Sequence, residues 1–145
     1  MAALLRFWGL KRVCGLAGDD PYSAGGMSAF VAAAKVEGLY VQLKSTFTTG
    51  TNDVKKNIKD LVDNNCMIVV FFGQAQDMKN VFDEADRVGF TAAQRGVQWV
   101  LSELFAGSMK DACTNLVLCE RVLRGGIVLT PGELLFVLLE YSTVS

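Results

Sequence analysis

Two adjacent carboxylates are the first residues of the sequence whose types and spacing could do chemistry. Asp19 and Asp20 follow an apolar run at residues 13–17. A carboxylate pair at the end of a strand can hold Mg²⁺ when a further acid at the end of another strand and a lysine lie nearby. The strongest apolar run, residues 66–72, is not followed by an acid, so this further ligand is missing. The alternative is that one aspartate caps the following helix while the other is solvated. We favour this alternative because acids are common at helix starts.

Other common chemistries are excluded by composition. The loop after residues 13–17 carries neither G-x-G-x-x-G nor G-x-x-x-x-G-K-[ST], so a bound dinucleotide or nucleoside triphosphate is not expected. The chain has no histidine, which excludes histidine acid–base catalysis and histidine metal sites. Its net charge of −1, without a cluster of basic and aromatic residues, argues against nucleic-acid binding. We therefore expect no cofactor.

The elements that would position the aspartates alternate along the chain. Apolar runs indicate strands and amphipathic runs indicate helices, with short loops between them. This rhythm predicts an α/β fold, a parallel sheet with helices on both faces, in one domain over residues 1–145 whose core is 7–105. We expect strands at 13–17, 39–47, 66–72, 97–101 and 125–129 and helices at 24–37, 54–63, 77–88 and 106–120, with Ser23 as the cap of the first helix. Residues 134–141 would be a helix, or a strand with no partner in this chain.

A polar rim is expected at one edge of this sheet. The carboxyl ends of parallel strands meet at the same edge, and each expected strand is followed there by polar residues. Together with an aromatic ring in the first turn they form a surface typical of sites for an amino acid or a similar small polar molecule. Each residue also has an ordinary structural explanation, since loops are polar. The candidate ligand contacts are Tyr22, Ser23, Gln74, Ser102 and Glu103, with Thr48 and Thr49 beside them.

The cysteines give no firm indication of a compartment. Cys14 and Cys66 fall inside apolar runs, where we expect buried free thiols. Cys113 and Cys119 could pair in an oxidising environment, although we favour the unpaired state because short-range pairs need particular geometry. No segment has the pattern of a signal peptide, and no apolar run reaches membrane-spanning length.

The ordered series of motifs resembles a known family. The segments FWGLKRVCGLAGDDPYSAGGMSAF, STFTTGTNDVKKNIKDLVDNNCMIVVFFG, MKNVFDEADRVGF and VQWVLSE are similar to the second lobe of type I periplasmic-binding-protein-like receptor domains. These are the ligand-binding regions of natriuretic-peptide, metabotropic glutamate and GABA-B receptors and of bacterial amino-acid-binding proteins. The match covers residues 7–105, and GGIVLTPG at 125–132 is similar to a later strand of the family.

The resemblance implies a ligand-binding lobe of a cell-surface receptor or solute-binding protein, not an enzyme. Such a lobe senses a small polar ligand, such as an amino acid, when the cleft closes. By this resemblance Tyr22 and, less directly, Ser102 and Glu103 contact the ligand, and Ser23 stands where the family usually has glycine. The family's first lobe is absent, so we expect a fragment that binds weakly alone. A full-length parent would be an extracellular receptor domain, attached to the membrane only through parts missing here.

Two other functions stay open at this point. One is an enzyme on a receiver- or flavodoxin-like fold that uses Asp19 and Asp20 with magnesium. The other is a homodimerisation module that pairs through the helix at residues 24–37.

Overall fold

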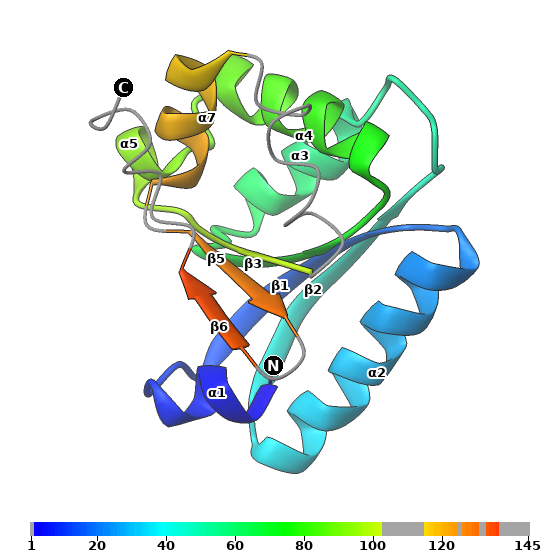
Figure 1. Ribbon diagram of the computed structural model, residues 1–145, viewed down its shortest axis with the longest axis vertical. Coiled ribbons are helices and arrows are strands. Elements are labelled where there is room, and N and C mark those ends of the chain that lie inside the picture. Colours follow the sequence, from blue (N-terminus) through cyan, green and yellow to red (C-terminus); the bar gives the residue numbers. More distant parts are fainter. Residues whose placement is uncertain (1, 103–114, 125, 131–132, 137–145) are drawn as a thin grey trace.

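The chain is built around one twisted sheet (Figure 1). The computed structural model describes residues 2–102, 115–124, 126–130 and 133–136. Six strands lie in the order β2-β1-β3-β4-β5-β6. Pairing is parallel from β2 through to β5, and β5 and β6 form an antiparallel pair. The strands are β1 (Arg12–Gly18), β2 (Tyr40–Phe47), β3 (Ile68–Phe72), β4 (Gln98–Leu101), β5 (Ile127–Thr130) and β6 (Glu133–Phe136).

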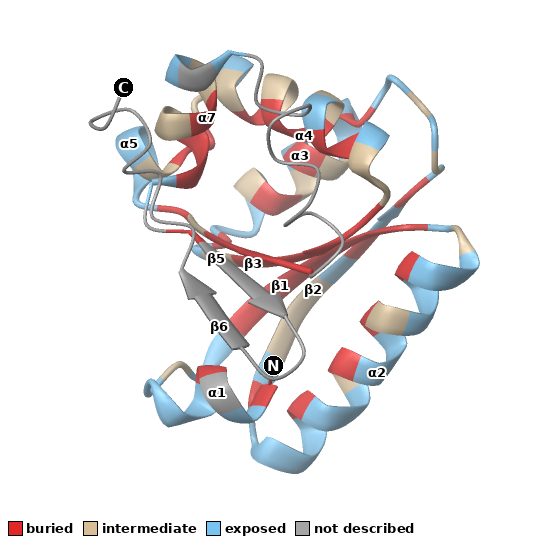
Figure 2. Cartoon of the chain, in the orientation of Figure 1, coloured by how far each residue is buried: buried red, intermediate tan, exposed pale blue. Residues whose placement is uncertain are grey.

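Helices cover both faces of the sheet, which confirms the predicted fold class. On one face lie α1 (Ala2–Phe7) and α2 (Pro21–Glu37), and on the other lie α3 (Lys55–Asp63), α4 (Ala75–Arg87), α5 (Ala92–Arg95) and α7 (Leu116–Leu123) (Figure 1). The strands β1, β3 and β4 are largely buried and the edge strand β2 only in part, while the outer sides of the helices are exposed (Figure 2). This burial is typical of parallel sheets, whose strands are covered on both faces.

Alternate residues of the strands build two separate cores. In β3, Val69 and Phe71 face α3 and α4, whereas Val70 and Phe72 face α2. The first core is aromatic, and the fully buried Trp99 makes edge contacts with its rings. The second core is filled by the buried side of α2, and Met27 and Phe30 are among its members. Both faces of the sheet are therefore fixed by packing up to the loops that follow the strands.

Most predicted elements are present, with two corrections at their ends. The first helix begins at Pro21, and its cap is Asp20 instead of Ser23, because the Asp20 carboxylate accepts the Ser23 N–H. Residues 134–141 were expected to form a helix or a strand without a partner, but residues 134–136 belong to β6, which pairs with β5, and residues 137–141 lie outside the described part. Of the helix expected at 106–120, residues 106–114 lie outside the described part and α7 accounts for the end. The short helices α1 and α5 were not predicted.

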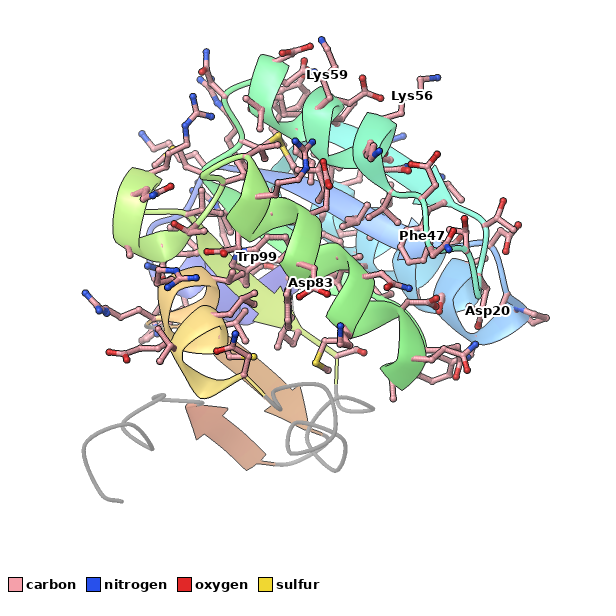
Figure 3. The ribbon with its side chains drawn as sticks, turned by 90° about the horizontal axis from the view of Figure 1, so that it is seen from above. Asp20, Phe47, Lys56, Lys59, Asp83 and Trp99 are labelled. Carbon is pink, nitrogen blue, oxygen red and sulfur yellow. A yellow bond between two sulfur atoms is a disulfide. The ribbon has the colours of Figure 1, made fainter. Side chains whose placement is uncertain are left out.

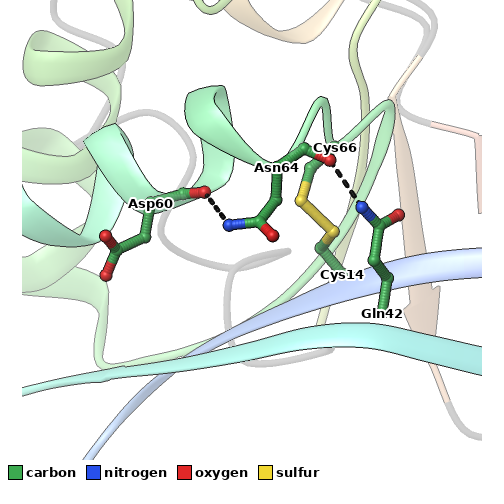
Figure 4. The surroundings of a disulfide bond; sticks show 5 residues. All are labelled: Cys14, Gln42, Asp60, Asn64 and Cys66. Carbon is green, nitrogen blue, oxygen red and sulfur yellow. Dashed lines mark hydrogen bonds between the residues drawn. A yellow bond between two sulfur atoms is a disulfide. The ribbon is translucent and has the colours of Figure 1, made fainter.

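The prediction of two free thiols is wrong for Cys14 and Cys66. Both are buried, as expected, but they form a disulfide with a Cα–Cα distance of 5.9 Å (Figure 4). The physical reason is sheet order. Strand β3 pairs directly with β1, and Cys66, two residues before β3, lies on the same side of the sheet as Cys14, in the core under α3 and α4. The possible pairing of Cys113 with Cys119 involves Cys113, which lies outside the described residues.

Candidate functional site

The loops that follow β1, β2 and β3 meet at one edge of the sheet. β1 lies between β2 and β3, and the helix after β1 covers one face while the helices after β2 and β3 cover the other. A crevice at such a switch point is the usual ligand position in open parallel sheets. This edge is therefore where the sequence-predicted site residues can come together.

Asp20 is the hub of a hydrogen-bond network between these loops. Its carboxylate accepts from the Ser23 N–H (3.0 Å), from Thr49 Oγ1 (2.7 Å) and from Gln74 Nε2 (2.8 Å). The Asp20 N–H also donates to Thr49 Oγ1 (3.1 Å). Partial burial opposes ionisation, but the bonds from Thr49, Ser23 and Gln74 outweigh it and hold the pKa of Asp20 well below its usual range. The site therefore carries a fixed negative charge at neutral pH.

Asp19 and Asp77 extend the network to a third carboxylate. The exposed Asp19 accepts the Thr49 N–H at 2.9 Å. Asp77, almost fully buried in the first turn of α4, accepts the N–H groups of Gly50 (2.9 Å) and Gln74 (3.3 Å). Burial raises the pKa of Asp77, and the nearby Asp20 and Asp19 charges add to this rise against the two backbone hydrogen bonds.

Asp77 was missed as a member of this group by sequence reasoning. One signal for it exists: Gln74 and Asp77 stand at the cap and third positions of α4, and an acid at that third position often accepts the N–H of the cap residue. The Asp77 carboxylate also accepts the N–H of Gly50 from another loop, and nothing in the sequence around Asp77 indicates this second contact.

The structure brings some predicted ligand contacts together and leaves others apart. Tyr22 lies in the first turn of α2 with 41% of its surface exposed. Gln74 is half-buried and bound to Asp20. Ser23 and Ser102 are buried, and neither hydroxyl has a hydrogen-bond partner among the described residues. Glu103 lies outside the described residues. A ligand at this edge can thus touch Tyr22 directly, whereas Ser23 and Ser102 become accessible only if covering groups move.

The carboxylate oxygens are largely used within the protein, which bears on the magnesium alternative. Both oxygens of Asp20 and both oxygens of Asp77 accept hydrogen bonds. Among the described residues no group of three or more acids or cysteines is arranged to hold a metal ion. The arrangement acts as a clamp between loops, with Asp20 lying at the edge beyond the end of β2 at Phe47 (Figure 3).

Comparison with protein-family models gives a match over residues 1–128, to the receptor family ligand binding region. The chain belongs to this family. It is therefore a ligand-binding region of the type I periplasmic-binding-protein fold, as the sequence resemblance indicated.

A solved structure supports the same fold for the receptor-family chain. A solute-binding protein of an ABC transporter from R. palustris, crystallised in complex with 4-hydroxybenzoate, is similar with a TM-score of 0.61 and 19% identity. The similarity covers 70% of this chain and 27% of that protein, so the chain spans about a quarter of that protein's length. Curated protein sequences gave no match. None of the described helices is long and apolar enough to cross a membrane.

Proposed function

We propose that this receptor-family chain binds a small polar ligand with an ammonium group, such as an amino acid, at the edge formed by the loops after β1 to β4. The observation that carries the proposal is the pair of carboxylates, Asp19 and Asp20, beside the exposed ring of Tyr22. Membership of a ligand-binding family and the position at a switch point of the sheet support it.

The charge of the edge favours a cationic group over an anionic one. Asp20 stays ionised because its pKa is far below neutral, and its carboxylate occupies the start of α2, where an anion would otherwise be attracted. Asp19 is exposed, and only one of its oxygens accepts a hydrogen bond from a described residue. Its second oxygen is therefore available to an ammonium group, which would form a charge-assisted hydrogen bond there.

Tyr22 would add contact area and orientation to this charge. Its ring lies on the first turn of α2, two residues after Asp20, and a tyrosine supplies apolar surface with a polar tip. Ser23 and Ser102 would add hydroxyl groups that have no hydrogen-bond partner in the part of the chain that the structure describes. Gln74 donates its side-chain nitrogen to Asp20, which holds its side chain at the same edge. Glu103 follows Ser102 directly in the sequence and is proposed on the family resemblance alone.

The Cys14–Cys66 disulfide supports an extracellular or periplasmic location. Disulfides persist in oxidising compartments and are rare in the cytosol. In that setting the chain would be one lobe of a receptor or solute-binding protein that signals or delivers its ligand through closure against a second lobe. Because one lobe makes only part of the contacts, we expect an affinity on the order of millimolar for this chain alone.

Pairing of two copies through α2 is a second candidate role with its own observation. The outward side of α2 carries small uncharged residues and the exposed Val36, and its charged residues, Lys35 and Glu37, are confined to the last turn, so most of two such surfaces would meet without charge repulsion. A molecular mass that rises with concentration in light scattering, and that Ala32→Arg returns to the monomer value, would support it. A constant monomer mass at all concentrations would contradict it.

An NMR titration of the isotope-labelled chain tests the ligand proposal. Alanine and propionate share a carboxylate and a methyl group, but only alanine has the ammonium group. We expect alanine to shift the amide signals of Asp19 and Tyr22 in a saturable way and propionate to leave them in place. The variant Tyr22→Ala should weaken the response to alanine, whereas Tyr40→Ala, at the opposite edge of the sheet, should not.

Two results would contradict the proposal. Equal shifts with alanine and propionate would show that the carboxylate pair does not select an ammonium group. The absence of shifts with every member of an amino-acid panel, at concentrations well above millimolar, would refute binding by this chain. Saturable shifts at Asp19 on addition of Mg²⁺, removed by Asp19→Asn, would favour the magnesium alternative instead.

A further inference from the structure

A groove between α3 and α4 lies outside the candidate site and shares no residue with it. Its cavity volume is about 320 Å³, at the lower end of the range for ligand-sized pockets. The groove runs over the outer layer of the molecule, and Lys56 and Lys59 project outward from α3 there (Figure 3). Its lining residues are Lys55, Lys56, Lys59, Val62, Glu84, Arg87 and Val88.

The rim of the groove carries surplus positive charge in a chain whose net charge is −1. Four cationic side chains and one carboxylate line it. That carboxylate, Glu84, accepts hydrogen bonds from Arg87 Nε at 2.9 Å and Nη2 at 2.5 Å, and Lys59 pairs with Asp63 at 2.6 Å. Lys55 and Lys56 form no ion pair with any described residue. Lys55 acts on Glu84 through its charge, so the ammonium group of Lys56 and, in part, that of Lys55 are available to an acidic partner.

The floor of the groove is apolar. Val88, just after α4, is 41% exposed, and Val62 of α3 is half-buried beside it. The methylene stems of the lysines can lie along this floor while their ammonium groups stay in water. An apolar floor with a cationic rim matches a segment that presents aliphatic side chains flanked by carboxylates, as an amphipathic helix does when it docks into a groove.

We propose that the α3–α4 groove docks an acidic, aliphatic segment of a partner protein. The aliphatic side chains would cover Val62 and Val88, and the acidic side chains would face Lys55 and Lys56. A sulfated polysaccharide would use the same lysines but would not need the valine floor, and no aromatic ring lines the groove on which a sugar could stack. The valines therefore distinguish a peptide from a polyanion.

A synthetic helical peptide with glutamates and leucines at helical spacing is the probe. Its dissociation constant is measured by fluorescence anisotropy against the full chain and three variants. Lys55→Gln/Lys56→Gln should bind roughly three- to tenfold more weakly, because two exposed charge interactions are lost. Val88→Ser should weaken binding without changing its dependence on salt concentration. The control Lys35→Gln/Lys44→Gln makes the same change in net charge at exposed lysines outside the groove and should bind like the parent.

Three outcomes would overturn the proposal. The first is equal weakening by the control variant, which would show attraction to overall charge alone. The second is unchanged binding in Val88→Ser, or binding of a leucine-free glutamate peptide as tight as that of the probe. The third is displacement of the probe peptide by heparin together with unchanged probe binding in Val88→Ser. This result would assign the groove to a polyanionic glycan.

Discussion

Removal of the Cys14–Cys66 disulfide is the perturbation whose magnitude follows most directly from the structure. The two cysteines are 52 residues apart in sequence, so the bond closes a long loop of the unfolded chain. The loop-closure relation gives a stabilisation of about 4 kcal/mol for a loop of this length. Since domains are stable by only about 5–15 kcal/mol, the double variant Cys14→Ala/Cys66→Ala should lose a large fraction of its stability.

Urea unfolding followed by tryptophan fluorescence measures this loss, because Trp99 is fully buried in the folded chain. With a slope of about 1–3 kcal/mol per molar urea, the midpoint should fall by roughly 2 M. The slope should also increase, because an unfolded chain without the crosslink exposes more surface. The parent unfolded with a reductant should resemble the double variant. The double variant with the same reductant shows how much the other two cysteines contribute to the free energy of unfolding.

This reasoning is refuted if the double variant loses little free energy of unfolding and the slope of that free energy against urea concentration is unaltered. A loss of less than about 1 kcal/mol would mean that the bond does not restrict the unfolded state as the loop-closure relation requires. A large loss with an unaltered slope would instead assign the effect to the folded state, where truncation of two buried side chains leaves a cavity.

Two further predictions concern α2 and its cap. Asp20→Ala should destabilise the chain by about 1–2 kcal/mol, because the Ser23 N–H and the neighbouring loops lose their acceptor. The folded-state pKa of Asp20 lies below its ordinary value of 3.8, so the ionised carboxylate stabilises the fold fully above about pH 4. This contribution is lost as the pH falls further. The urea midpoints of the parent and of Asp20→Ala should therefore converge at low pH. Gly26→Ala should cost about 1–3 kcal/mol, because a Cβ there would lie 2.6 Å from the Phe72 ring, whereas Gly25→Ala has open space and should stabilise by about 0.5–1 kcal/mol. A thermal melt in which both alanine variants shift in the same direction would contradict the packing argument.

The strands and helices could be predicted because their signals are local. Apolar runs bounded by acids, glycine and asparagine mark the strands, and Gly38 ends α2 with a φ of 74°, which glycine adopts without strain. The end of the chain was less predictable, because β6 follows β5 directly as an antiparallel strand and departs from the alternation of strands and helices. One local signal was present there: Thr130 pairs with Glu133, and Pro131-Gly132 between them is a turn-forming dipeptide.

Contacts between loops could not be predicted, because they depend on the order of the strands in the sheet. The sequence places Asp20, Thr49 and Gln74 after three successive strands, but only the order β2-β1-β3 brings the last two to opposite sides of Asp20. The same order explains the missed disulfide. Each cysteine lies in an apolar run, as a buried free thiol would, and nothing local indicates that β1 and β3 are neighbours.

The two missed features act on the same pair of strands at opposite ends. Near the amino ends of β1 and β3, the disulfide joins Cys14 to Cys66. At their carboxyl ends, the hydrogen bond from Gln74 to Asp20 joins the loops that follow. Between these links the strands pair in register, so the position of Asp20 relative to Gln74 is determined by the fold itself. A ligand at this edge would meet carboxylates already in place, and it would not have to order the loops that carry them. The edge described here is therefore preorganised for the ligand proposed above, and little of the conformational cost of binding falls on its loops.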